Sequence, residues 1–295
     1  MMISTNGCAV PGIMATRTLD SKRDRLITMF VTSFMICGAK LPIFALLIGA
    51  FFSENRTLVM FVMYVLSVCI ALMAAKLLSK TALKGESAHF VMELPPYHIP
   101  TIKGLFLKMW ERGWMYIRKA GTILILVSII MWAGFKYPQT PENPDLTQEE
   151  AAAVQIENSV LGRMGNFISP VVRPIGMDGN ISIALIAGLA AKEVVVSTLG
   201  TLYSLGDIDD TESDEATAPL REKIASDKDW SPLKAIAFLI FCMIYPPCIV
   251  ALTVFFKESG SKIKWLALLF MGNTAFAWFA AFCVFQIGTL LKLGV

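Results

Sequence analysis

The sequence contains few charged residues for its length of 295, since Asp, Glu, Lys and Arg together make up only 17% of it. A soluble domain carries about 25% charged residues and divides its apolar positions into periodic stripes. Here 55% of the side chains are hydrophobic, and the mean hydropathy is +0.61. These values exclude a soluble enzyme, a disordered tail and a secreted disulfide scaffold. The net charge of +3 is small, and the basic residues are scattered between apolar runs, so the sequence also argues against a nucleic-acid partner.

Histidine and phosphate-binding motifs are also scarce. The only histidines are His89 and His98, both in a hydrophilic stretch, so one chain cannot form an all-histidine metal site in a membrane. No Gly-x-x-x-x-Gly-Lys-Ser/Thr loop and no His-Glu-x-x-His motif occurs, so we expect no GTP hydrolysis and no other enzymatic activity from this chain. Residues 1–17 are too polar for a signal-peptide core, and we expect no cleavage there.

Long apolar runs are what the sequence does contain. Each needs about 20 residues to cross a hydrocarbon core of ~30 Å. Six candidates meet this length approximately: residues 26–52, 57–75, 121–135, 181–203, 233–256 and 265–291. The sequence therefore predicts an all-α integral membrane protein with about six transmembrane helices.

The distribution of Lys and Arg predicts the orientation, because these residues accumulate in cytoplasmic loops. Basic residues precede the first run at 17–25 and fill the connection at 76–119, so both segments are expected in the cytoplasm. The connection at 136–180 begins with acidic residues and is expected outside. The three lysines at 257–264 fall in a loop that the same count places outside, which indicates that one span is re-entrant or miscounted.

All six cysteines lie in or beside apolar runs, which is not the pattern of a disulfide framework. Three of them stand close to helix breakers: Cys8 near Pro11, Cys37 near Pro42, and Cys248 directly after Pro246 and Pro247. Proline inside a span frees a backbone carbonyl that lipid cannot satisfy, so broken helices usually face protein or a wet cavity, as in transporters. The alternative for each position is a structural kink with a packing thiol beside it.

Three charged residues lie within the apolar runs. Lys40 is central in the first run, and Lys192 and Glu193 are central in the fourth. A charge at the bilayer centre costs roughly 2.5–3.5 kcal/mol on insertion scales, so such side chains usually face the bundle interior and find partners. Our hypothesis is that Glu193 pairs with Lys40 or Lys192 beside the broken helices. A purely structural pair is the alternative to a pair that lines a path.

A weak internal repeat divides the chain. Residues 7–18 align with 188–199, and residues 43–46 align with 249–252. This pattern is typical of transporters built from two gate-like repeats. The second copy needs an insertion, which we assign to an acidic, solvated loop near 206–230.

The division gives three parts: a first membrane repeat at 1–77, a cytoplasmic connector at 78–120 and a second membrane repeat at 121–295. Within the connector, the prolines at 93–100 predict a stiff extended segment. Apolar residues from Ile102 to Ile117 then recur at helical spacing against basic ones, which predicts an amphipathic helix in the inner interface. Packing of this helix on another soluble domain is the alternative.

Several motifs together resemble the membrane domain of the bacterial ferrous iron transport protein B family. They are Gly7-Cys8-Ala9-Val10-Pro11-Gly12, Cys37-Gly38-Ala39-Lys40-Leu41-Pro42, Met92-Glu93-Leu94-Pro95-Pro96-Tyr97, Ala191-Lys192-Glu193-Val194 and Tyr245-Pro246-Pro247-Cys248. The resemblance implies a multi-pass protein of the bacterial inner membrane that moves Fe(II). It also implies that Cys8, Cys37 and Cys248 line the ion path. From the helix breakers and the charges within the apolar runs, we expect gating or charge-pairing roles for a further set of residues: Lys40, Pro42, Lys192, Glu193, Pro246 and Pro247.

The sequence departs from this family in three respects. It has no phosphate loop, it begins just before the first Gly-Cys motif, and Pro246 stands where the family motif usually has threonine. The resemblance therefore implies a partner that supplies the G-protein domain or the N-terminal half, and a homo-oligomer is a further possibility.

Fe(II) is expected as the transported ion, with no tightly bound cofactor, because thiolate affinity rises toward copper and a conduction site must release its ion. Two alternatives remain at this stage: a gate-type transporter of an organic solute such as a nucleoside, and a membrane assembly partner that transports nothing.

Overall fold

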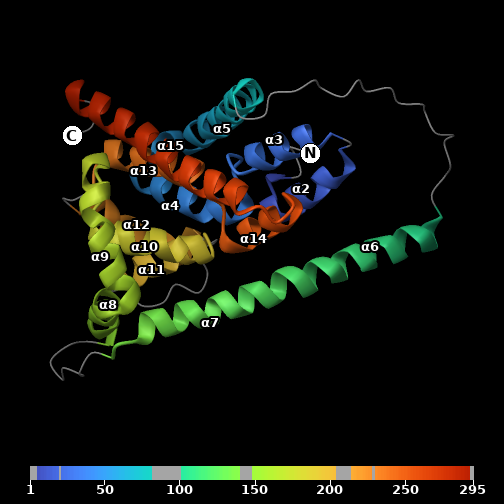
Figure 1. Ribbon diagram of the computed structural model, residues 1–295. Coiled ribbons are helices and arrows are strands. Elements are labelled where there is room, and N and C mark those ends of the chain that lie inside the picture. Colours follow the sequence, from blue (N-terminus) through green and yellow to red (C-terminus); the bar gives the residue numbers. More distant parts are fainter. Residues whose placement is uncertain are drawn as a thin grey trace.

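The computed structural model describes residues 5–19, 21–81, 101–139, 148–203, 214–227 and 230–292, and all regular structure in these ranges is helical (Figure 1). This confirms the all-α prediction for the described part of the chain. The proline-rich segment at 93–100 and both histidines lie outside it.

The first predicted run, at residues 26–52, forms two helices and not one, and a shorter helix precedes them. Helix α2 (Ala9–Ala15) is followed by α3 (Lys22–Thr32), which begins where the Ser21 side chain accepts a hydrogen bond from the Asp24 backbone N–H. The chain then breaks, makes a 3-10 turn at Gly38–Lys40 and continues as α4 (Leu41–Phe51). Another 3-10 turn leads into α5 (Arg56–Lys80), which contains the second predicted run.

The predicted amphipathic helix is present but does not stand alone. Helix α6 (Ile102–Tyr116) continues through a π-helical turn at Ile117–Gly121 into α7 (Thr122–Lys136). Figure 1 shows α6 and α7 as one long rod, with α7 beside the bundle and α6 extending past it. Its location at an inner interface stays a prediction.

The second half repeats the pattern of helix, break and helix. Helix α10 (Gly179–Ala190) breaks before α11 (Val194–Leu202), and α13 (Pro232–Ile244) breaks before α14 (Ile249–Glu258). The Asp178 and Ser231 side chains accept hydrogen bonds from the first turns of α10 and α13, which fixes where those helices begin. Helix α15 (Ile263–Leu290) then runs unbroken.

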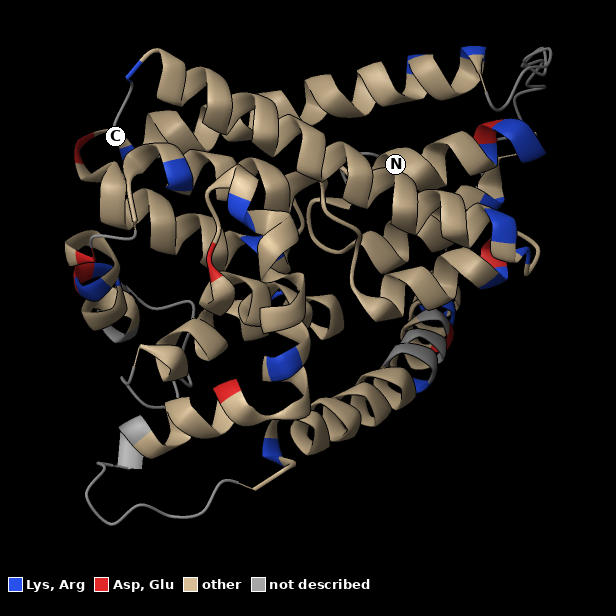
Figure 2. Cartoon of the chain, turned by 60° about the vertical axis from the view of Figure 1, so that its left-hand side comes forward, with Lys and Arg blue, Asp and Glu red and all other residues tan. Residues whose placement is uncertain are grey.

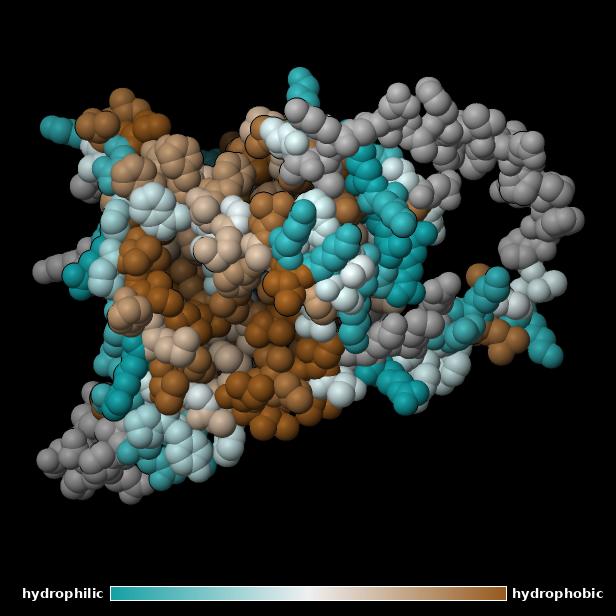
Figure 3. All heavy atoms as spheres, viewed as in Figure 1, coloured by the Kyte–Doolittle hydropathy of each residue, from teal (hydrophilic) through white to brown (hydrophobic). Residues whose placement is uncertain are grey.

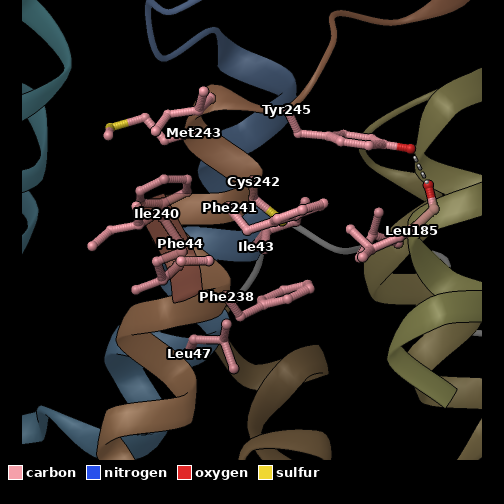
Figure 4. Packing of buried hydrophobic residues seen from close by; sticks show 14 of the residues in the cluster. Ile43, Phe44, Leu47, Leu185, Phe238, Ile240, Phe241, Cys242, Met243 and Tyr245 are labelled. Carbon is pink, nitrogen blue, oxygen red and sulfur yellow. Dashed lines mark hydrogen bonds between the residues drawn. The ribbon is translucent and has the colours of Figure 1, made fainter. Parts of the chain in front are cut away.

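Helices α4 and α13 form the centre of the bundle. Phe44 from α4 and Phe238 from α13 are both 0% exposed, and Figure 4 shows their side chains among those of Ile43, Leu47 and Phe241. Lipid tails are as apolar as leucine, so close packing and internal hydrogen bonds hold such a core together more than exclusion of water does. The broken ends of these central helices are therefore held inside protein.

Three helical stretches are long and apolar enough to cross a membrane: Ser53–Lys80, Pro232–Glu258 and Ile263–Leu290. Shorter apolar helices occupy Gly38–Phe51, Thr122–Lys136 and Gly179–Ala190. Helices α5 and α15 carry large exposed apolar side chains, such as Phe61 and Met271, of the kind that suits lipid. Figure 3 shows hydrophobic residues over much of the face in view. The chain is thus a helical membrane protein, and six predicted runs correspond to a mixture of whole and interrupted helices.

Two segments differ from the sequence interpretation. The connection at 136–180 contains α8 (Gln148–Asn158) and α9 (Val160–Val172), and α9 packs along α10. The acidic insertion contains α12 (Asp214–Ser226), whose Leu220 and Ile224 are fully buried beside α4. The prediction of a solvated loop is therefore wrong for this part, because two apolar residues one turn apart give α12 a buried face. Residues 204–213 and 228–229 of the insertion lie outside the described ranges.

The basic segments that disagreed in the orientation count lie at one end of the structure. Glu258, at the end of α14, binds both Arg17 and Arg25, and Arg23 donates to the Ser79 carbonyl at the end of α5. Of the three lysines at 257–264, Lys257 precedes Glu258 in α14, Lys262 lies in the turn after it, and Lys264 lies in the first turn of the next helix. Figure 2 shows blue and red segments gathered at the right-hand end of the bundle, with others scattered over the rest of it. Because helices α3–α4 and α13–α14 are interrupted, an apolar run need not be a single crossing, and the side on which the 257–264 segment lies stays a prediction.

Candidate functional site

The helix breaks meet around a cavity of about 340 Å³. Its wall includes the three cysteines predicted for the path and three charged residues from the same prediction: Cys8, Cys37, Cys248, Lys40, Lys192 and Glu193. Pro247 also lines it, while Ile117, Gly121 and Leu124 close one side from the π-helical turn and α7. Residues separated by more than 200 positions in the sequence are thus brought to one place.

Each cysteine of the cavity stands at the start of a helical segment. Cys8, Cys37 and Cys248 are the N-cap residues of α2, of the Gly38–Lys40 turn and of α14. All three have extended backbone angles, which is why the helices begin after them and not before. A thiol at such a position lies at the break itself, next to the backbone that the break exposes.

A backbone contact joins the first two cysteine segments. The Gly38 N–H donates to the Gly7 carbonyl at 3.0 Å. Cys8 directly follows Gly7 and Cys37 directly precedes Gly38, so both cysteines adjoin this contact. A Cβ at position 38 would lie 3.1 Å from the Gly7 oxygen, closer than an ordinary contact. Glycine at position 38 therefore permits this approach.

The second break results from two consecutive prolines. In an α-helix the N–H of residue i binds the carbonyl of residue i−4, and Pro246 and Pro247 have no N–H to donate. The carbonyl of Met243 thus loses the donor that residue 247 would have supplied. Lys40 Nζ takes its place, at 2.8 Å from the Met243 oxygen.

Lys40 is 2% exposed and has two further acceptors. Its Nζ lies 3.3 Å from the Met35 carbonyl and 3.5 Å from the Ser33 carbonyl, both in the break after α3. The buried ammonium therefore joins the break after α3 to the break after α13. Its partners are backbone oxygens, which sequence reasoning could not identify.

Lys192 and Glu193 are arranged differently from the hypothesis of a charge pair. Lys192 is buried, and its Nζ lies 4.2 Å from the centre of the Tyr245 ring. Glu193 is exposed at the start of α11, and no ion pair joins it to either lysine, although all three residues are described. The predicted pairing is wrong for this structure because an aromatic face and three carbonyls already satisfy the two ammonium groups.

Pro42 lies in the first turn of α4, where a backbone N–H has no partner within the helix in any case. It therefore starts a helix and does not break one, and it is buried away from the cavity wall. Pro246 is part of the second break without lining the cavity. Of the three prolines, only Pro247 contacts the cavity.

Two supporting residues were not identified from the sequence. Tyr245, which lies under Lys192, donates to the Leu185 carbonyl at 3.4 Å (Figure 4). Asn273, buried in α15, donates to Ser33 Oγ at 2.8 Å and so supports the first break. An amide in the middle of a long apolar run was a signal for the second of these, because such groups need a partner in lipid.

The three thiols share the cavity without forming a compact ligand set. Within the described ranges, no three His, Cys, Asp or Glu side chains are close enough together to hold a metal ion. All six cysteines are described, and none forms a disulfide. The arrangement can offer an ion single thiol contacts along a wall.

Two family models match the chain. The model described as ferrous iron transport protein B C terminus matches residues 60–112. The model described as nucleoside recognition matches residues 1–51 and 117–262, which include every cavity cysteine and both buried lysines.

Curated relatives match nearly the whole chain. A Campylobacter jejuni protein named Fe(2+) transporter FeoB is 44% identical over 293 residues, which cover 98% of this chain and 46% of that protein. A Porphyromonas gingivalis Fe(2+) transport protein A/Fe(2+) transporter FeoB fusion protein is 42% identical over 314 residues, covering 96% and 37%. A Helicobacter pylori Fe(2+) transporter FeoB is 36% identical, covering 98% and 48%. The chain thus spans less than half the length of these relatives, and no solved structure matches it.

Proposed function

Because this chain belongs to the ferrous iron transport protein B family and corresponds to its C-terminal membrane half, we propose that it forms the membrane path for Fe(II) in such a transporter. The observation that carries the proposal is the convergence of Cys8, Cys37 and Cys248 on one cavity between broken helices. The whole path, its direction and its energy source belong to the complete transporter.

The chemistry of the cavity suits an ion in transit. Thiolates bind Fe(II), but their affinity increases toward copper, so a tight thiolate cage would select the wrong metal. Thiols distributed over three helix starts provide successive weak contacts, and conduction requires binding that is loose enough to release the ion. Fe(II) is in this account the substrate and not a resident cofactor.

The proposed location is the bacterial inner membrane, with several crossings. The end of the bundle that carries Arg17, Arg25 and the 257–264 turn faces the cytoplasm in this proposal, since basic residues accumulate on that side. The joint binding of Arg17 and Arg25 to Glu258 supports a single charged end. The opposite end of the bundle then faces outward.

A partner for this half is part of the proposal. The relatives named as Fe(2+) transporters are more than twice as long as the region they share with this chain. We propose that the complete machine includes a G-protein domain and further membrane helices, either in the same polypeptide or in another. GTP hydrolysis is assigned to that part.

Uptake of Fe(II) by iron-starved bacteria that lack their own ferrous transporter tests the proposal. The chain is expressed alone, and then with the missing half of a relative. Single changes of Cys8, Cys37 and Cys248 to serine are each expected to lower uptake while the protein stays in the membrane, and Cys69→Ser on exposed α5 serves as the matched control. Normal uptake in all three cavity variants would contradict the thiol path.

A steric variant tests the cavity without removing a ligand. Gly121 lines the cavity, and a Cβ built there meets no atom within 4 Å, so leucine fits the fold and fills the open space. Gly113 in α6 has the same freedom but lies off the cavity. Uptake should fall in Gly121→Leu and remain in Gly113→Leu.

A second candidate is transport of an organic solute such as a nucleoside, because the family model that covers most of the cavity is described as nucleoside recognition. Uptake of a radiolabelled nucleoside by the same cells distinguishes the two. Nucleoside uptake that ignores Fe(II), together with no iron uptake in either expression format, would favour the second candidate.

A further inference from the structure

The carbonyl oxygens of Ser33, Met35 and Met243 surround one point inside the protein. Lys40 Nζ occupies that point at 3.5, 3.3 and 2.8 Å from them. An ammonium has three N–H donors, and here three acceptors are within reach. No carboxylate in the described part of the chain forms an ion pair with this buried charge. Backbone dipoles alone therefore compensate it.

These oxygens are available because both helices end there. Ser33 is the C-cap of α3, and Met243 lies in the last turn of α13, so their carbonyls are among those that a helix leaves unpaired. The last carbonyls of a helix carry partial negative charge, which favours a cation nearby. Two helix ends and the irregular segment at Met35 thus point oxygen atoms at the same position.

The distances indicate which cation this position fits. Divalent ions hold oxygen ligands at about 2.0–2.6 Å. The Lys40 contacts are longer: the one to Met243 has the length of an ordinary ammonium hydrogen bond, and those to Met35 and Ser33 are longer still. The site is therefore sized for an amine or a large monovalent ion and not for the transported Fe(II).

We propose that the Ser33, Met35 and Met243 carbonyls form a monovalent-cation site, filled permanently by the Lys40 ammonium, which fastens the two helix breaks together. Lys40 is in this view a positioning residue that keeps Cys37 and Cys248 in place around the cavity. The proposal rests on the proposed function only where iron uptake is the readout. The site itself is independent of what the cavity transports.

Replacement of Lys40 by alanine removes the atoms of a propylammonium ion and leaves their space empty. In the complete transporter, Lys40→Ala should lower Fe(II) uptake at least several-fold, since buried oxygens lose their donors. Added n-propylammonium should restore much of it. Tetramethylammonium, which carries charge but no N–H, should not restore it. Cys248→Ser is the control for a general stimulation of uptake by n-propylammonium, because an amine cannot repair the loss of a thiol.

A second readout separates this proposal from the proposed function. The alkylation rates of Cys37 and Cys248 in the purified transporter should change in Lys40→Ala and return toward wild type with n-propylammonium, whether or not iron is carried. Unchanged alkylation rates in Lys40→Ala would overturn the proposal. A folded Lys40→Ala protein whose rates change but do not respond to n-propylammonium would also overturn it.

A filled variant covers the case in which Lys40→Ala does not accumulate. Lys40→Met occupies the same volume without a donor, so n-propylammonium cannot enter. The amine should then raise the membrane level of Lys40→Ala but not that of Lys40→Met. An equal response of the two variants, or no response of either, would show that the amine does not act at this site.

Discussion

Two of the helix breaks that border the cavity, between α3 and α4 and between α13 and α14, arise in different ways. The break between α13 and α14 follows from Pro246 and Pro247, which remove two backbone donors in succession. The break between α3 and α4 contains no proline, because Pro42 comes after it in the first turn of α4. It depends instead on contacts from Asn273 and Gly7 and on the side chain of Lys40, which lies within the break itself.

This difference indicates what determines the shape of each break. The break between α13 and α14 is encoded locally, whereas the break between α3 and α4 is assembled largely by tertiary contacts. Lys40 connects them, because it belongs to the first break and binds the carbonyl that Pro247 leaves unpaired in the second. Changes in the second break should therefore act through local backbone geometry, and changes in the first through lost contacts.

The largest effect is expected for Pro247→Ala. The new N–H can bind the Met243 carbonyl and extend α13, which takes the closest acceptor from Lys40 and moves Cys248. Uptake should fall roughly tenfold, about the value of one buried hydrogen bond. Pro42→Ala is the matched control, because no helix bond is restored in the first turn, and its uptake should equal wild type. Equal losses in both variants would show that the position of the proline does not matter.

Gly38→Val is expected to cause the next largest decrease in uptake, and to act only on the first break. Its Cβ and methyl groups would meet the Gly7 carbonyl and weaken the 3.0 Å bond that keeps Cys8 beside Cys37. Loss of about 1 kcal/mol corresponds to roughly fivefold lower uptake. Gly272→Val on α15, where a Cβ meets nothing within 4 Å, should leave Fe(II) uptake unchanged. Equal Fe(II) uptake in the two valine variants would contradict a role for the contact between Gly38 and Gly7.

Tyr245 tests the second break without touching its prolines. Tyr245→Phe retains the ring under Lys192 and loses only a 3.4 Å hydrogen bond, so its thermal stability should stay close to wild type. Tyr245→Ala removes the ring and should destabilise the protein by about 1–2 kcal/mol or more, because the buried ammonium loses its cation–π partner. Thermal unfolding in detergent measures both. A loss in Tyr245→Phe as large as in Tyr245→Ala would assign the effect to the hydroxyl instead.

The smallest effect is expected for Asn273→Ala, which removes the hydrogen bond from α15 to Ser33. Interhelical hydrogen bonds in membrane proteins average about 0.6 kcal/mol and reach about 1.7. A decrease of that size in unfolding free energy should appear for Asn273→Ala but not for Thr274→Ala, whose hydroxyl donates only within its own helix. Equal unfolding free energies of the Asn273→Ala and Thr274→Ala variants would show that α15 does not support the first break.

The origin of the two breaks also determines what the sequence predicted. Consecutive prolines announce a break, and a lysine or glutamate in an apolar run indicates a special environment, so Cys248, Lys40 and Lys192 could be assigned to the candidate site. The carbonyl partners of Lys40 could not, since backbone oxygens carry no sequence signal. The sequence predicted an ion pair between Glu193 and a lysine, because nothing in it indicated that the aromatic face of Tyr245 would be the partner of Lys192.

The fold was predictable to a similar degree. The long apolar runs predicted α5 and α15 correctly, because the length of an apolar run is enough to recognise a helix that has no break. Helix α9 was missed, although Val160, Met164 and Phe167 follow one another at helical spacing, because acidic residues before it suggested an outside loop. Helix α12 was missed because its buried face consists of only a few residues among charged ones.

The most direct test of the central claim is whether Fe(II) protects specific thiols from alkylation. The complete transporter is treated with N-ethylmaleimide under anaerobic conditions with and without Fe(II), and each of the six cysteines is quantified by mass spectrometry. Fe(II) should slow the modification of Cys8, Cys37 and Cys248 and leave Cys69 and Cys283 unchanged. Equal rates at the three cavity cysteines with and without Fe(II), or equal protection of Cys69, would contradict an iron path through this cavity.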